Sequence, residues 1–192
     1  WNLQAASAAL VTSLDDFRQL FSSEVLAPGL GIAIRNLTFL FSDLKDSTQI
    51  YDTIGDSPAY ARVRDHFDIM RSIIGTHNGA LVKTIGDEIM SRFPTADVGV
   101  RAACEMHSAI KEDADLAKWR IAIRIGLHHG PVLEIGKDDV VGDAVNVAAR
   151  MSALAKADQI FTTRDTITHL CSELQLITRS LGQSWVKGKQ DE

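Results

Sequence analysis

The apolar residues of this chain recur with two different periods, and the order of these periods restricts the fold more than any other feature of the sequence. Apolar side chains at every second position predict strands, and apolar spacings of three and four predict helices. Strands are predicted over residues 37–43, 80–85, 88–93, 119–127 and 131–135. Helices are predicted over residues 57–74, 96–110 and 141–156. The main order is therefore strand, helix, strand, strand, helix, strand.

This order is typical of an α+β, ferredoxin-like (βαββαβ) fold, in which helices pack on one face of an antiparallel sheet. The first strand of such a sheet lies centrally. Pro28 and the glycines beside it mark a break before the pattern begins. We expect residues 1–30 to form an N-terminal helix and a linker from an upstream region, and residues 31–192 to form one domain.

The composition excludes several classes of protein. With 45% hydrophobic and 23% charged residues, the chain resembles a globular domain with a good core. A net charge of −5 and the lack of a basic stripe argue against nucleic-acid binding. No run approaches the roughly 20 apolar residues of a membrane span, so no membrane contact by this domain is expected. Cys104 and Cys171 lack CxxC spacing, which favours buried thiols in a reducing, cytoplasmic compartment. His128 and His129 lack HExxH spacing, so we expect residues at a strand end and no zinc ligands.

Two aspartates stand where predicted strands end. Asp43 continues the parity of Phe39 and Phe41, and Asp87 lies in the bend between two later strands. Each alone is equally typical of a helix cap or a turn. In a ferredoxin-like sheet, however, the two positions can meet at one edge, where their charges repel unless a cation lies between them. Hard oxygen ligands of this kind suit magnesium or manganese.

Other polar residues interrupt the apolar pattern less clearly. Lys83 shares a strand face with apolar neighbours and is either a surface lysine or a buried functional one. Asn146 and Arg150 lie four positions apart, so a helix places them on one face, where they are either solvated or able to reach a sugar and a phosphate together. Arg124 and Lys187 are surface charges unless another signal assigns them a role.

Four segments together supply that signal. FSDLKDST, VKTIGDEIM, RIGLHHGPV and DVVGDAVNVAARM resemble the catalytic domain of the class III nucleotidyl cyclases, the adenylate and guanylate cyclase family. The resemblance covers about residues 34 to 190, in the family's order, and the GxxVNxAxR helix with its upstream aspartate is its most specific part. The fold implied is the class III cyclase fold, whose core is the ferredoxin-like arrangement.

The resemblance implies two divalent cations, Mg²⁺ or Mn²⁺, held by Asp43 and Asp87, with Leu44 in the same metal site. It also implies contacts to the triphosphate. Those contacts are assigned to Arg124, to Lys187, and to Ser47 and Thr48, where free N–H groups at the start of a helix would cradle phosphate oxygens.

The resemblance further implies how the rest of the nucleotide is bound. Lys83 and Asp139 match the pair that reads the base, Asn146 the residue that orients the ribose, and Arg150 the residue that stabilises the transition state. A lysine donor and an aspartate acceptor fit N1 and the amino group of adenine, whereas guanine presents the opposite pattern. ATP is therefore the expected substrate, with cyclic AMP and pyrophosphate as products.

The family works as a head-to-tail homodimer with its active sites at the interface, and an upstream regulatory domain is expected. Two alternatives remain: a guanylate cyclase of the same family, and a catalytically weak nucleotide-binding regulatory module. The sequence departs from the family at Asp46 and Glu88, where relatives often have glycine. It is also expected to be cut short before the family's last strand.

Overall fold

The structure is a computed structural model that describes residues 32–45, 47–119, 121–135, 139–175 and 178–182. The predicted helix within residues 1–22 therefore lies outside the described residues. The strands are β1 (Ile32–Leu44), β2 (Ala80–Ile85), β3 (Glu88–Phe93), β4 (Ile123–Ile135), β5 (Asp139–Val141) and β6 (Ile160–Thr162). The helices are α3 (Ser47–Ile54), α4 (Asp56–Thr76), α5 (Ala96–Glu112), α6 (Ala114–Lys118), α7 (Asp143–Leu154), α8 (Arg164–Thr168) and α9 (Ser172–Gln175).

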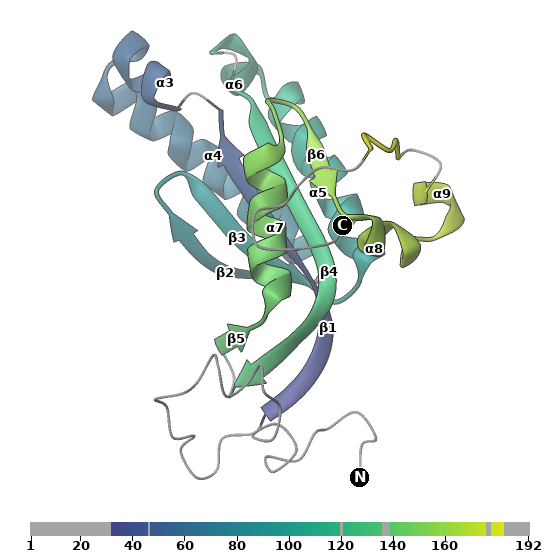
Figure 1. Cartoon of the computed structure of the whole chain (residues 1–192). Coiled ribbons are helices and arrows are strands. Elements are labelled where there is room, and N and C mark those ends of the chain that lie inside the picture. The colour runs from purple at the N-terminus through teal and green to yellow at the C-terminus, as the bar shows by residue number, and fades with distance from the viewer. Residues whose placement is uncertain (1–31, 46, 120, 136–138, 176–177, 183–192) are drawn as a thin grey trace.

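The sheet confirms the predicted topology. Its strands lie in the order β2-β3-β1-β4-β5, and β6 pairs with β4 beside this path. β1 is central and runs antiparallel to both β3 and β4, as a ferredoxin-like core requires. The pairing of β4 with β6 is parallel, so the complete sheet is mixed. β1 and β4 are long strands that extend beyond β2 and β3 (Figure 1).

Helices cover both faces of the sheet, whereas the sequence predicted helices on one face. α4 and α5 lie behind the sheet and α7 lies in front of it (Figure 1). The side chains of β1 follow this division, because Leu40 packs in the core with α4 and α5, and Phe39 and Phe41 pack in a second cluster with α7. Asp43 continues the parity of Phe39 and Phe41, so it faces the side of the sheet that carries α7.

The predictions of two strands over 119–127 and 131–135 were wrong in one respect, since a single strand, β4, runs from Ile123 to Ile135. His128 and His129 therefore lie within a strand and not at its end, and they are only 6% and 9% exposed. β4 is continuous because Gly130 lies within the strand and does not form a turn. A Cβ atom at Gly130 would lie 3.3 Å from the Cβ of Ala144, so this glycine allows the start of α7 to approach the strand.

α7 comes closest to the sheet at Gly126, and this contact gives a testable prediction. A Cβ atom there would lie 1.8 Å from the main-chain nitrogen of Ser152. Gly126→Ala should therefore push α7 away and lower the free energy of unfolding by at least about 1–3 kcal/mol, as measured by urea denaturation. The matched control is Gly75→Ala in α4, where a Cβ meets nothing within 4 Å and should be neutral or stabilising. Equal effects of the two substitutions would contradict this account of the packing.

Candidate active site

Asp43 lies near the end of β1, directly opposite Arg124 of β4. The two side chains form an ion pair in which Nε of Arg124 donates to Oδ2 of Asp43 at 2.8 Å, and Nη2 of Arg124 donates to the same oxygen. Both side chains are shielded, with exposed fractions of 17% for Asp43 and 32% for Arg124. The predicted metal ligand and the predicted phosphate contact are thus joined to each other within one chain.

Glu88 adds a second carboxylate beside Asp43. Ser42 pairs with Ile89 and Phe41 with Met90, so the next step of this register places Glu88 next to Asp43 on the β3 side. Cross-strand neighbours share a face of the sheet. Burial raises the pKa of Glu88, as do the charges of Asp43 and Asp87, whereas Arg124 and Lys83 lower it. Glu88, Asp43 and Arg124 consequently form one row across three strands, within electrostatic range of Asp87 and Lys83.

Asp87 lies in the two-residue turn that joins β2 to β3. The preceding Gly86 has φ of 63°, a left-handed conformation that favours glycine. Oδ2 of Asp87 is buried and has no hydrogen-bond partner among the described residues. A buried carboxylate oxygen without a partner is unfavourable. The turn therefore holds an acceptor that a cation or a donor would stabilise.

The donor set fits a hard divalent cation, although the site is not a closed cage. Asp43, Asp87 and Glu88 supply only oxygen donors, and Oδ2 of Asp87 is unused. Within the described part of the chain, no group of three or more His, Cys, Asp or Glu side chains is arranged to hold a metal ion. Magnesium and manganese sites often need only one or two carboxylates, with water and substrate phosphates as the other ligands.

Asn146 and Arg150 lie on α7, away from its buried stripe. Val147 and Ala148 of this helix face the sheet, whereas Asn146 is exposed and Arg150 is partly buried. Among the described residues, neither side chain has a hydrogen-bond or ion-pair partner. Lys83 is also exposed, on the edge strand β2, opposite Met90. The structure of one chain therefore does not join these three residues to Asp43 or Asp87 through a hydrogen bond or an ion pair.

The remaining predicted residues are placed only in part. Ser47 and Thr48 open α3 as expected, but only their main-chain positions are described. Asp139 begins β5, again as a main-chain position, and Lys187 lies outside the described residues. The side chain of Leu44 is 3% exposed and packs in the core with α4 and α5. Only its main chain could serve a metal site.

His66 of α4 is a buried polar residue that the sequence analysis did not single out. Its side chain is fully buried, and burial lowers its pKa to about 4. The negative charge of Asp87 opposes this shift, which places the Asp87 carboxylate within electrostatic range of the imidazole. The signal in the sequence was a histidine on the apolar face of a predicted helix, between Val63 and Met70.

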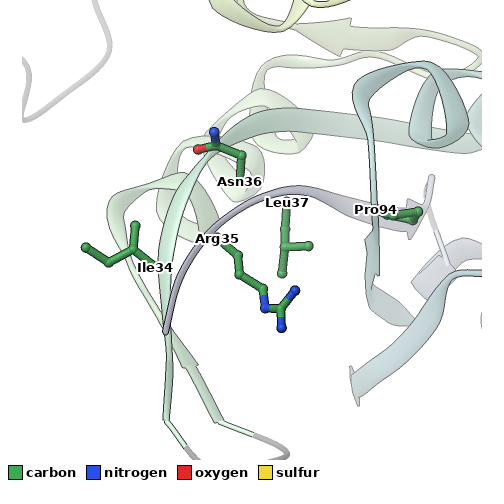
Figure 2. A pocket seen from close by; sticks show the side chains of 5 residues that line it. All are labelled: Ile34, Arg35, Asn36, Leu37 and Pro94. Atoms are coloured by element: carbon green, nitrogen blue, oxygen red, sulfur yellow. The ribbon is translucent and has the colours of Figure 1, made fainter. Parts of the chain in front are cut away.

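Two pockets among the described residues lie away from the predicted site residues. One of about 530 Å³ is lined by Ile34, Arg35, Asn36, Leu37 and Pro94, with Arg35 and Leu37 pointing to the same side of β1 (Figure 2). Another of about 300 Å³ lies around His128, His129 and His169. Neither contains a predicted site residue.

Comparison with known proteins decides the family. Residues 33–192 match the family described as the Adenylate and Guanylate cyclase catalytic domain. The chain belongs to this family. Its curated relatives include an adenylate cyclase from Anabaena cylindrica, which is 29% identical over 98% of this chain and 44% of the relative. They also include retinal guanylyl cyclase 2 from Bos taurus, which is 31% identical over 78% of this chain and 14% of the relative.

Solved cyclase structures share the fold. The adenylyl cyclase CyaB from P. aeruginosa superimposes with a TM-score of 0.73 at 22% identity, covering 84% of this cyclase domain and 92% of that chain. The catalytic core of a rhodopsin-guanylyl cyclase with converted specificity, in complex with ATPαS, gives a TM-score of 0.72 at 28% identity, covering 82% and 93%. This cyclase domain spans less than half of its Anabaena relative. Among the described helices, none is long and apolar enough to cross a membrane.

Proposed function

We propose that this cyclase domain is an adenylate cyclase that converts ATP to 3′,5′-cyclic AMP and pyrophosphate at the interface of a homodimer. The observation that carries this proposal is the group of Asp43, Glu88 and Arg124 in one row, with Asp87 in the adjoining turn. This group combines oxygen donors for cations with a guanidinium that suits phosphate. We place the domain in the cytoplasm, within a longer protein that carries an upstream regulatory domain.

Two divalent cations, Mg²⁺ or Mn²⁺, would be held by Asp43 and Asp87, with the main chain of Leu44 in the same site. When bound, these cations would lower the pKa of the ribose 3′-hydroxyl and neutralise the charge of the triphosphate. Asp43 can offer both carboxylate oxygens only if Arg124 turns away from it. The released guanidinium would then pair with a phosphate oxygen, so the negatively charged phosphate replaces the carboxylate as its partner.

The other nucleotide contacts would come from the partner subunit. Asn146 would orient the ribose and Arg150 would stabilise negative charge on the pentavalent phosphorus. Their position on the outer side of α7, without partners among the described residues, supports a role toward a second chain. Ser47, Thr48 and Lys187 would complete the contacts to the triphosphate.

The base would be read by Lys83 and Asp139. Exchanging both residues, Lys83→Glu with Asp139→Cys, should lower the use of ATP sharply and raise the relative use of GTP, because buried polar groups without partners discriminate strongly. The measurement is kcat/KM for both nucleotides with Mn²⁺. Lys118→Glu is the control, since this lysine at the end of α6 is exposed and is not among the proposed nucleotide contacts. An unchanged preference for ATP in the double variant would place the base pocket elsewhere.

The proposed function itself is tested by incubating the purified domain with ATP or GTP and manganese and measuring cyclic products. Cyclic AMP as the main product is expected. Cyclic GMP as the main product would instead identify a guanylate cyclase. The family includes relatives of both kinds. The absence of both products from a folded dimer would favour a regulatory nucleotide-binding module.

A further inference from the structure

Three histidines lie together where α8 meets β4, and the proposed mechanism uses none of them. His128 and His129 belong to β4, and His169 is the C-cap of α8. All three line the pocket of about 300 Å³ that also contains Asp165 of α8 and Asp143 of α7. The ring centroids of His129 and His169 are 4.9 Å apart. We call these three residues the histidine cluster, and side chains of this type change their charge near neutral pH.

The histidine cluster attaches α8 to β4 by hydrogen bonds. The main-chain N–H of His129 donates to Oγ1 of Thr166 at 2.9 Å, and Nδ1 of His128 lies 2.7 Å from Oγ1 of Thr163. The two threonine hydroxyls are themselves 3.1 Å apart. Leu170, which follows α8, packs in the core with α4 and α5. Release of α8 would therefore break these hydrogen bonds and expose apolar surface.

The ring of His129 is held in one neutral form. Its Nδ1 atom lies 2.9 Å from Oγ1 of Thr38, a fully buried hydroxyl on the central strand β1. Among the described residues, this hydroxyl has no other hydrogen-bond partner. A buried hydroxyl without an acceptor is unfavourable, so Thr38 donates and Nδ1 of His129 accepts. A proton added at Nδ1 would place two donors against each other and break this bond.

The surroundings of His129 also oppose a positive charge on its ring. Burial lowers the pKa of His129, and the imidazoles of His169 and His128 lower it further. The neighbouring side chain on β1, Thr38, is neutral, and α5 meets that threonine at Gly99. The titratable groups beside His129 come from three elements: His128 of β4, Asp143 of α7, and His169 and Asp165 of α8. The two carboxyl groups do not reverse the shift, because the pKa of His129 remains lowered.

We propose that the histidine cluster is a pH-sensitive switch, in which protonation of His129 releases α8 from β4 while the rest of the sheet stays folded. Protonation breaks the bond to Thr38 and places an imidazolium beside two other imidazoles in a nearly buried site. Opening of α8 lets the ring reach water, so opening and proton uptake occur together. The inference does not depend on the proposed catalytic function.

The sign of the pH dependence follows from the lowered pKa. The closed form binds the proton at His129 less tightly than the open form does. The closed form is therefore fully favoured above the ordinary histidine pKa of about 6.5, and it loses stability as the pH falls from there toward the lower pKa of the closed form. Acid should open the contact between α8 and β4, and a return to neutral pH should close it.

The test is amide hydrogen exchange of the full chain, measured by NMR and corrected for the intrinsic exchange rate at each pH. The amide of His129 reports the switch, because its partner is Oγ1 of Thr166. Its equilibrium constant for opening should rise about tenfold between about pH 7.5 and about pH 5.5, as expected for one proton taken up at an ordinary histidine. The amide of Ile125 is the internal control in the same strand, because it donates to the main-chain oxygen of Gln159 and should change little. Equal rises at His129 and Ile125 would indicate global unfolding and overturn the proposal.

His129→Asn separates the switch from general effects of acid. The asparagine amide oxygen can replace Nδ1 as the acceptor for Thr38, and it does not titrate, so the tenfold rise should disappear. His107→Asn is the matched control, because burial also lowers the pKa of His107, but this residue lies on α5 near Asp158 and Lys111. The rise at the amide of residue 129 should persist in His107→Asn. A rise in His129→Asn as large as in the wild type would overturn the proposal.

Should His129→Asn not fold, the ring ¹⁵N signals of His129 in the wild-type protein decide. The proposal expects Nδ1 to stay without a proton for as long as the amide of His129 is protected. A ring that titrates at the ordinary pKa of about 6.5 while this amide stays protected would show that α8 tolerates the charge, and the proposal would be wrong.

Discussion

Asp43→Asn and Asp87→Asn are each expected to abolish formation of the cyclic nucleotide. The expected loss of turnover exceeds the roughly 100-fold that removal of an outer-shell partner can cost. Asparagine keeps the volume and removes the charge, so each variant should retain its fold. The expected loss arises because a two-cation site with one carboxylate missing no longer balances the positive charge it must hold. The measurement is turnover of ATP with saturating Mn²⁺, alongside the far-ultraviolet circular dichroism of each variant.

The stability of the two variants should differ, and this difference tests the geometry. Asp43→Asn leaves Arg124 without its ion-pair partner, so a lower free energy of unfolding is expected. Asp87→Asn neutralises a group whose buried oxygen has no partner in the described chain, so stability should hold or rise. Asp68→Asn, at an exposed pair with Arg71 on α4, is the control and should change neither activity nor stability. Substantial turnover in Asp43→Asn or Asp87→Asn would remove the assignment of that residue to the metal site.

The sequence was sufficient for the sheet core because its signals were local. Alternation in β1 and β3 and the helical spacing of α4 and α5 each depend on neighbouring residues only, and their order then selects one topology. The continuity of β4 could not be predicted in this way. Gly130 is as typical of a turn as of a close approach, and its contact with Ala144 depends on α7, which follows later in the chain.

The candidate site shows the same limit. The resemblance predicted separate roles for Asp43 and Arg124, but their pairing depends on the register of β1 against β4, which spacing in the sequence does not determine. Glu88 was recognised as a departure from the family, while its place beside Asp43 required the register of β3. His66 was hidden because a histidine on an apolar helix face resembles an ordinary core residue, and only the missing hydrogen bonds distinguish it.

The head-to-tail arrangement of the proposed homodimer is tested by mixing two inactive variants. Asp43→Asn and Arg150→Ala should each be nearly inactive alone, because both sites of either homodimer are damaged. In a mixed dimer, one site combines both lesions, while the other combines the intact aspartates of the Arg150→Ala subunit with the intact Arg150 of its partner. Random pairing makes about half of the dimers mixed, each with one good site of two, so activity should recover to roughly a quarter of wild type.

A second mixture makes this test specific to the geometry. Asp43→Asn mixed with Asp87→Asn should not recover, because head-to-tail pairing draws both aspartates of a site from one subunit, and each site of the mixed dimer then lacks one carboxylate. Asp43 and Asp87 of one chain both raise the pKa of Glu88 through their charges, which supports this expectation. Coexpression with two different affinity tags isolates the mixed dimers and removes the need for subunit exchange. The expected activity of the isolated mixed dimers of the first mixture is then about half of wild type, since each has one good site of two. Recovery in the second mixture would mean that the two aspartates of a site come from different subunits. No recovery in demonstrably mixed dimers of the first mixture would mean that Arg150 acts within the chain that supplies Asp43.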